Sequence, residues 1–170
     1  RLLYNIPYNY DERKAHNRPQ NHPTSLHPQL ARAMINLTGI QEGTILDPFC
    51  GSGGILIEAA LMNLTPIGHD INSEMITRAR YNLRAQKLSP KISKKDATTL
   101  EEPIDYLATD LPYALNSKTT DLNTLYSSFI TTLTQILKKR AVIGFPSFYN
   151  YKKIINKTDL KIEHEFTIPL

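Results

Sequence analysis

Apolar residues recur along the chain with two different spacings. Stretches with apolar residues three or four positions apart predict helices, and short apolar runs bounded by turn residues predict buried strands. The predicted helices are residues 27–37, 55–62, 73–86, 122–138 and 149–156. The predicted strands are residues 44–46, 66–69, 91–95, 104–109, 141–145 and 160–168. Strands that alternate with helices favour an α/β fold, with a mostly parallel, doubly wound sheet covered on both faces.

The first 25 residues show neither spacing. They are rich in Asn, Pro, Tyr and Arg, which predicts an extended, loop-like arm. We therefore expect an N-terminal arm over residues 1–26 and one folded domain over residues 27–170, a size typical of a single domain. Because the chain begins with Arg1, we also expect it to be part of a longer protein.

The amino-acid composition gives only limited information about the class of protein. The formal charge of +4 and the pI of about 9.1 would suit a polyanionic partner. The single cysteine, Cys50, excludes an internal disulfide and predicts a reducing, cytoplasmic setting. No apolar run reaches the roughly 18 residues that a membrane span requires, so we expect no membrane partner.

Acidic residues mark the carboxyl ends of the predicted strands. Asp47, Asp70 and Asp110 each end a strand, and Asp96 follows the third one. A single aspartate in such a place is most often a turn or helix-capping residue. Ligands of doubly wound sheets bind at the carboxyl ends of the strands, so four acids there predict a binding site.

A glycine-rich turn follows the first strand, in the order Asp47-Pro48-Phe49-Cys50-Gly51-Ser52-Gly53-Gly54. Glycines allow a ligand to approach backbone amides at the start of a helix. The dinucleotide-binding pattern requires a further glycine where Leu56 stands. The Asp47 carboxylate would repel a pyrophosphate but could attract an ammonium group. The turn therefore favours a ligand other than a dinucleotide.

This turn resembles motif I of class I S-adenosylmethionine-dependent methyltransferases, which have a Rossmann-like fold. The resemblance implies that Asp70 binds the ribose hydroxyls and that Asp96 and Ala97 contact adenine. It implies S-adenosylmethionine as the cofactor and no metal. The cofactor contacts expected in the domain are Asp47, Gly51, Ser52, Gly53, Asp70, Ile71, Asp96, Ala97 and Asp110.

The segment Asp110-Leu111-Pro112-Tyr113 resembles the Asp-x-Pro-Tyr motif of enzymes that methylate exocyclic amines of bases. Such an amine is a poor nucleophile because its lone pair is delocalised. The Asp110 carboxylate and the Leu111 carbonyl can each accept one N–H, which aims the lone pair at the methyl group. Pro112 restricts Leu111 to an extended conformation, and Tyr113 can stack on the base. These four residues are the expected catalytic set.

The segment before the glycine turn is similar to that of RNA methylases that carry a THUMP domain. Arg18-Pro19 and the run His22-Pro23-Thr24-Ser25-Leu26-His27-Pro28 carry this likeness, which is strongest to archaeal tRNA guanosine N2-methyltransferases acting at position ten. The likeness implies methylation of guanine N2 in tRNA by a monomer. It makes Thr24 and Ser25 cofactor contacts and places an RNA-gripping THUMP domain before this chain.

The sequence departs from this family in two places. Ala114, Leu115 and Asn116 follow Tyr113, where the family commonly has a glycine and then a basic residue. The chain also ends near the sixth predicted strand, where the family continues into a seventh. The first departure concerns how the target base fits, more than the reaction itself.

Three alternative functions remain open on the sequence alone. A DNA adenine-N6 or cytosine-N4 methyltransferase would use a similar acid-x-Pro-aromatic motif. A non-catalytic RNA-binding module could share the fold, and a nicotinamide oxidoreductase could share the glycine turn. Cys50 lies in the predicted cofactor turn, away from the target base, so a small and partly buried residue is the favoured interpretation over a cysteine nucleophile.

Overall fold

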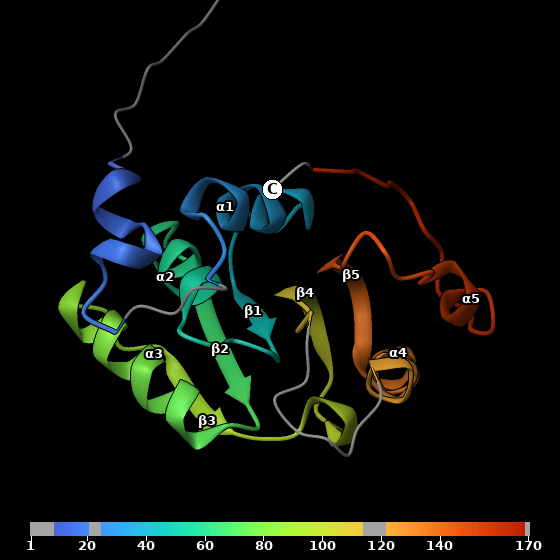
Figure 1. Ribbon diagram of the computed structural model, residues 1–170. Helices are drawn as coiled ribbons and strands as arrows, with labels where there is room; N and C mark the ends of the chain where they lie inside the picture. Colours follow the sequence, from blue (N-terminus) through green and yellow to red (C-terminus); the bar gives the residue numbers. More distant parts are fainter. Residues whose placement is uncertain (1–8, 21–24, 114–121, 169–170) are drawn as a thin grey trace, which may run out of the picture.

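The computed structural model describes residues 9–20, 25–113 and 122–168, and Figure 1 shows a single sheet with helices on both faces. The helices are α1 (Pro28–Leu37), α2 (Gly54–Leu61), α3 (Ser73–Ala85), α4 (Leu122–Ile136) and α5 (Lys152–Ile155). The strands are β1 (Thr44–Asp47), β2 (Thr65–Asp70), β3 (Lys91–Lys94), β4 (Ile104–Asp110) and β5 (Leu137–Gly144). Three short 3-10 turns are η1 (Asp11–Arg13), η2 (Ala15–Asn17) and η3 (Ala97–Thr99).

The five strands in the described part of the chain are parallel and lie in the order β3-β2-β1-β4-β5. The first strand of the sheet, β1, is the central one. The chain then adds β2 and β3 on one side of β1 and crosses back to form β4 on the other side. The crossover creates a switch point between β1 and β4, where doubly wound sheets bind their ligands. The predicted α/β fold with a parallel sheet is confirmed.

Successive residues of β1 and β4 point to opposite faces of the sheet. Ile45 and Ala108 are buried among side chains of α1 and α2. Leu46 and Leu107 are buried on the other face, in a cluster with side chains of α4. Helices therefore shield the apolar residues on both faces of these central strands from water. Because both faces are buried, the strands are continuous apolar runs.

The N-terminal arm packs on the domain through polar contacts. It contains the turns η1 and η2, where the sequence predicted only extended chain. The arm residue Arg13 donates to the fully buried carboxylate of Glu58 in α2, with 2.7 Å between Nε and Oε1. Asn82 of α3 donates to the Gln20 carbonyl and accepts from the Gln20 amide. These contacts join the described part of the arm to the helices beside the glycine turn.

The predicted strand 160–168 is wrong. No strand forms there, although its apolar residues alternate as they do in strands. Within the described residues, no strand pairs with this segment, so its backbone lacks the hydrogen-bond ladder that a strand requires. Exposed ion pairs from Glu163 to Arg140 and from Glu165 to Lys152 connect it to the rest of the molecule.

Other differences from the predicted elements are small. The helix predicted over 149–156 is reduced to α5, and α4 ends two residues early because β5 already begins at Leu137. Among the described residues, no helix is both long and apolar enough to cross a membrane.

We expect Glu58→Ala to lower the free energy of unfolding by about 3–5 kcal/mol, because it leaves two nearly buried guanidinium groups without their carboxylate. Arg13 and Arg32 both contact Glu58, and their side chains are 11% and 13% exposed. Urea-induced unfolding measures the change. The matched control is Glu74→Ala, which removes an exposed ion pair with Arg78 and should cost at most about 0.5 kcal/mol. Equal losses in the two variants would contradict this role of Glu58.

Candidate active site

Four aspartates gather at one edge of the sheet. Asp47, Asp70 and Asp110 are the last residues of β1, β2 and β4, and Asp96 lies two residues after β3 ends. The strands are parallel neighbours, so their carboxyl ends meet at the same edge. The tertiary structure thus brings together residues spread over more than sixty positions of sequence.

The glycine turn lies between this edge and α2. Gly51 and Gly53 have φ values of +49° and +89°, a backbone conformation that side chains disfavour. A Cβ atom on Gly53 would also stand 3.3 Å from the Cβ atom of Ala79 in α3. The two glycines therefore allow a tight turn that leads directly into α2, whose first amides have no partner within the helix.

Asp70 is fixed by the turn that it faces. One carboxylate oxygen accepts from the Gly51 amide at 3.0 Å, and the other accepts from the Asn72 amide at 2.8 Å. Partial burial raises the pKa of Asp70, and these two hydrogen bonds oppose that rise. The next residue, Ile71, is 63% exposed. A carboxylate beside an exposed apolar side chain matches what a ribose and its adjoining base require.

Asp47 is buried, with 3% of its surface exposed. Its Oδ1 accepts from the Thr109 hydroxyl at 2.7 Å and from the Phe49 amide at 3.3 Å. Burial raises the pKa of Asp47 to about 7, and the charges of Asp70 and Asp110 add to that rise. Asp47 therefore connects β1 to β4, and a cation nearby would favour its ionised form.

Asp96 and Ala97 begin the turn η3. The Oδ1 atom of Asp96 accepts from both the amide and the hydroxyl of Thr98, at 2.8 and 2.7 Å. Its Oδ2 is the oxygen that could accept from an adenine amine. Ala97 is buried, so its contribution to a ligand would come from the backbone.

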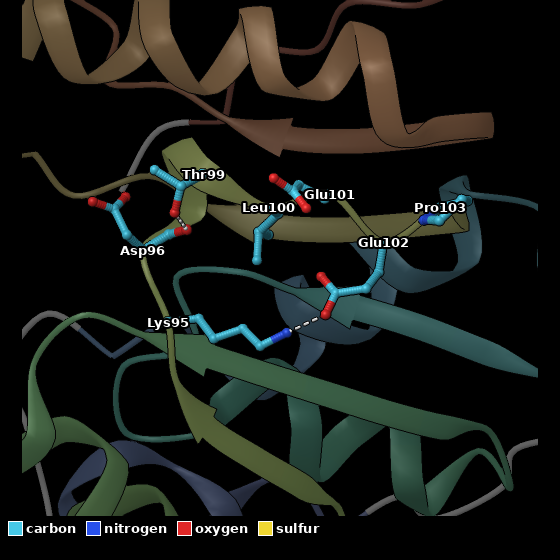
Figure 2. Close-up of a pocket in the computed structure, with 7 residues that line it drawn as sticks. All are labelled: Lys95, Asp96, Thr99, Leu100, Glu101, Glu102 and Pro103. Carbon is cyan, nitrogen blue, oxygen red and sulfur yellow. Dashed lines mark hydrogen bonds and ion pairs between the residues drawn. The ribbon is translucent and has the colours of Figure 1, made fainter.

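A hollow of about 630 Å³ lies along the crossover from β3 to β4. Figure 2 shows Asp96 at one end and the ion pair between Lys95 and Glu102 across the middle. Its other lining residues belong to the same segment, 99–103. Neither the glycine turn nor Asp70 or Asp110 lines this hollow, so it adjoins the strand-end site without being that site.

Ser25 and Ser52 lie side by side, with 2.8 Å between their hydroxyl oxygens. The structure therefore brings the end of the N-terminal arm to the glycine turn. Asn82 strengthens this junction because its amide group donates to the Ser52 carbonyl at 3.0 Å. The other expected arm contact, Thr24, lies outside the described residues.

The predicted catalytic segment begins at the end of β4. The Tyr113 hydroxyl donates to Oδ1 of Asp110 at 2.7 Å. Burial raises the pKa of Asp110, and this hydrogen bond opposes the rise. Burial and the adjacent carboxylate also raise the pKa of Tyr113 well above its usual range, so the phenol stays a donor. Asp110 and Tyr113 thus form one hydrogen-bonded unit.

Two residues that the sequence did not point to fix this segment. Gly144 of β5 is the register partner of Asp110, and its carbonyl accepts from the Leu111 amide at 3.1 Å. A Cβ atom on Gly144 would overlap Oδ1 of Asp110. The buried Tyr126 donates its hydroxyl to the Pro112 carbonyl at 2.5 Å. A single glycine in a strand and an aromatic residue within a helix carry no distinctive signal in the sequence.

The Tyr126 ring belongs to an aromatic cluster next to the catalytic segment. It meets Phe145 and Tyr149 edge-on, with ring centroids 5.7 and 4.7 Å apart. Phe145 also stacks on Tyr151 at 4.9 Å. This packing restrains the Tyr126 hydroxyl and hence the Pro112 carbonyl.

Cys50 has no features of a nucleophile. Its side chain is buried against α2 and α3, and burial raises the pKa of its thiol far above the usual value. The interpretation of Cys50 as a small packing residue is supported, because a thiol acts as a nucleophile in its ionised form.

The residues present fit S-adenosylmethionine. The glycine turn keeps a helix start free of side chains, Asp70 is held facing that turn, and Ile71 offers an apolar contact beside it. When bound, this cofactor supplies an electrophilic methyl group on a sulfonium. The residues that would hold it are Ser25, Asp47, Gly51, Ser52, Gly53, Asp70, Ile71, Asp96 and Ala97.

We expect Gly144→Ala to lower kcat for methyl transfer roughly 100-fold, since the added methyl group displaces the Asp110 carboxylate from its position. Steady-state kinetics measures this loss, and calorimetry should find cofactor affinity little changed. Val142→Ala is the control, since it lies in the same strand but its register partner is Ala108. A Gly144→Ala variant with unaltered kcat would show that the position of Asp110 is not constrained by Gly144.

Comparison with known proteins identifies relatives over most of the chain. A family of RMKL-like methyltransferase domains matches residues 15–170. The tRNA (guanine(10)-N2)-dimethyltransferase of Pyrococcus abyssi is 37% identical over 164 residues, which are 92% of this chain and 50% of that protein. The enzyme of the same name from Methanothermobacter thermautotrophicus is 35% identical over 156 residues, 87% of this chain and 46% of that protein. The chain thus spans about half the length of these curated relatives.

Solved structures agree with this relationship. The crystal structure of TrmN from Thermus thermophilus has a TM-score of 0.60 and 28% sequence identity, covering 68% of this chain and 36% of that chain. The resemblance found in the sequence to methyltransferases is therefore confirmed. The chain belongs to the family of RMKL-like methyltransferase domains.

Proposed function

We propose that this chain transfers a methyl group from S-adenosylmethionine to the exocyclic N2 of a guanine in tRNA. The observation that carries the proposal is the Asp110 carboxylate, held by Tyr113 at the end of β4 and facing Gly144. The names of its relatives favour guanine N2 in tRNA over an amine in DNA. The segment from Arg18 to Pro28 supports the same choice.

In this proposal Asp110 and Leu111 orient the target amine. The Asp110 carboxylate accepts one N–H of guanine N2, and the Leu111 carbonyl accepts the other. The Leu111 peptide is held in place because its amide donates to Gly144 and the next carbonyl, that of Pro112, accepts from Tyr126. Two fixed acceptors restrict rotation of the amine and direct its lone pair along the line of transfer.

The amine loses one proton for the methyl group it gains. Asp110 is the residue placed to accept that proton, and its raised pKa makes it a better base than an exposed aspartate. Tyr113, whose hydroxyl donates to the same carboxylate, keeps it oriented toward the amine. The half-exposed Tyr113 ring also offers a face on which the guanine can stack.

The remaining assignments also belong to the proposal. Ser25, Asp47, Gly51, Ser52, Gly53, Asp70, Ile71, Asp96 and Ala97 hold the cofactor, as does Thr24, which lies outside the described residues. A THUMP domain in the part of the protein beyond this chain grips the tRNA. We also propose that the protein acts as a monomer in the cytoplasm.

Nucleoside mass spectrometry of tRNA and of duplex DNA, after incubation with the full-length protein and S-adenosylmethionine, tests the function. We expect N2-methylguanosine or N2,N2-dimethylguanosine in the tRNA alone. Asp110→Ala should abolish the product while leaving cofactor affinity nearly unchanged, because it removes an acceptor for the amine. Methylated adenine or cytosine in the DNA, without any in tRNA, would contradict the proposal in favour of a DNA amino-methyltransferase.

The pH dependence of kcat/KM tests the unit formed by Asp110 and Tyr113. Activity should fall as the pH drops through the raised pKa of Asp110, because a protonated carboxyl cannot serve as the base. Tyr113→Phe removes the hydrogen bond that lowers this pKa, so the acidic limb should move to higher pH. Tyr126→Phe should lower kcat/KM without shifting the acidic limb of the profile to a different pH. Identical profiles for wild type and Tyr113→Phe would exclude Asp110 as the titrating group.

A further inference from the structure

Two of the three guanidinium nitrogens of Arg18 are buried without a hydrogen-bond acceptor among the described residues. The residue is 6% exposed, and its Nε donates to the Arg13 carbonyl at 2.8 Å. Its Nη1 and Nη2 have no partner, and within residues 9–20, 25–113 and 122–168 they are the only buried side-chain nitrogen or oxygen atoms in this state. Burying charged donors without an acceptor costs free energy, so native structures nearly always provide one. The Nη atoms of Arg18 are therefore free to bind an acceptor that the described residues do not supply.

The carboxylate of Glu58, whose charge acts on Arg18, does not fill this role. Glu58, one turn into α2, pairs with two other arginines: Oε1 accepts from Arg13, and Oε2 accepts from Arg13 and Arg32 at 3.3 and 3.4 Å. Neither oxygen accepts from Nη1 or Nη2 of Arg18. The charge of Glu58 still favours the charged form of Arg18, whereas burial lowers the pKa of Arg18. Glu58 therefore pairs with Arg13 and Arg32 and forms no hydrogen bond with the Nη atoms of Arg18.

Arg18 lies against the start of α2. Its Nη1 and Nη2 stand 3.3 and 3.6 Å from the position that a Cβ atom on Gly54 would occupy. Gly54 is the first residue of the eight-residue helix α2 and the last glycine of the cofactor turn. The first amides of a helix are donors at the positive end of its dipole. A buried cation and a positive helix end side by side form a site for an anion.

The structure assigns a partner to this site: we propose that Arg18 binds the α-carboxylate of the methionine part of S-adenosylmethionine. The proposal rests on S-adenosylmethionine being the cofactor and adds a residue outside the expected contacts. A carboxylate matches the planar fork of a guanidinium group, which can donate two parallel hydrogen bonds. The depth of Arg18 favours a small group inside the cofactor site over a phosphate of an RNA backbone.

The position of Arg18 agrees with the rest of the site. Asp70, the expected ribose contact, is bonded to Gly51 at the beginning of the glycine turn. Arg18 lies at the other end of that turn, at Gly54. The ribose and the methionine carboxylate are likewise at separate ends of the cofactor's thioether part. The arm that carries Arg18 would therefore become part of the cofactor site.

The test compares two ligands that differ only in this carboxylate. Isothermal titration calorimetry on the full-length protein uses S-adenosylhomocysteine and its decarboxylated analogue, which keeps the ammonium group. We expect wild type to bind S-adenosylhomocysteine roughly 10- to 100-fold more tightly than the analogue, the range of a charge-assisted hydrogen-bonded pair. Arg18→Gln should abolish most of that ratio and leave the affinity for the analogue unchanged.

Two further variants separate binding from folding. Arg18→Lys keeps the charge but loses the planar fork, so it should fold and give an intermediate ratio. Arg13→Lys is the matched control in the same arm, because it alters the pair with Glu58 and should lower the melting temperature without changing the ratio. A thermal melt of each variant without ligand reports its folding.

The outcomes are distinct. A ratio that is the same in wild type, Arg18→Gln and Arg18→Lys overturns the proposal for Arg18 while leaving the cofactor assignment intact. An unchanged ratio combined with weaker tRNA binding by Arg18→Gln overturns it in favour of an RNA phosphate. Absence of S-adenosylhomocysteine binding by folded wild type contradicts both the cofactor and the role of Arg18.

Discussion

Three carboxylates end neighbouring parallel strands, and keeping them in place at one half-buried edge is the constraint on which the site depends. Mutual repulsion and burial both favour their neutral forms, as the raised pKa of Asp47 shows. Each carboxylate has its own donors: Thr109 for Asp47, the Gly51 amide for Asp70 and the Tyr113 hydroxyl for Asp110. The donors come from a neighbouring strand, a glycine turn and a loop, so the three carboxylates are held independently of one another.

Positive charge is concentrated on the opposite side of the glycine turn. There the arm contributes Arg13 and Arg18, and α1 contributes Arg32, whereas the Glu58 carboxylate of α2 offsets part of this charge. The turn therefore lies between an acidic strand edge and a basic helix start. A zwitterionic methionine group, with one ammonium and one carboxylate, has charges that match these two sides.

Much of this site follows from residue type and order. Aspartates at predicted strand ends, glycines after the first strand and the Asp110–Tyr113 segment predict a cofactor turn and an acceptor pair at one edge of the sheet. The structure brings these residues together there, because parallel strands have their carboxyl ends at the same edge. The arm was harder to predict, since its 3-10 turns have no apolar period and dock through Arg13 and Asn82. The segment 160–168 shows the opposite case. Its apolar and polar residues alternate as in a strand, but a strand also needs a neighbouring strand for its hydrogen bonds. The alternation of residues does not show whether such a neighbour is present.

The sequence by itself determined the fold class, because that depends on the local spacing of apolar residues. Its motifs also predicted a cofactor turn and a catalytic segment, through their resemblance to methyltransferases. Only the tertiary structure decided that Gly144 leaves room for the Asp110 carboxylate, that Tyr126 holds the Pro112 carbonyl and that Arg18 is buried at the start of α2. Each of these contacts joins residues at least fourteen positions apart. Which residues meet in these contacts depends on how the helices and strands pack against one another, and no short stretch of sequence encodes that packing.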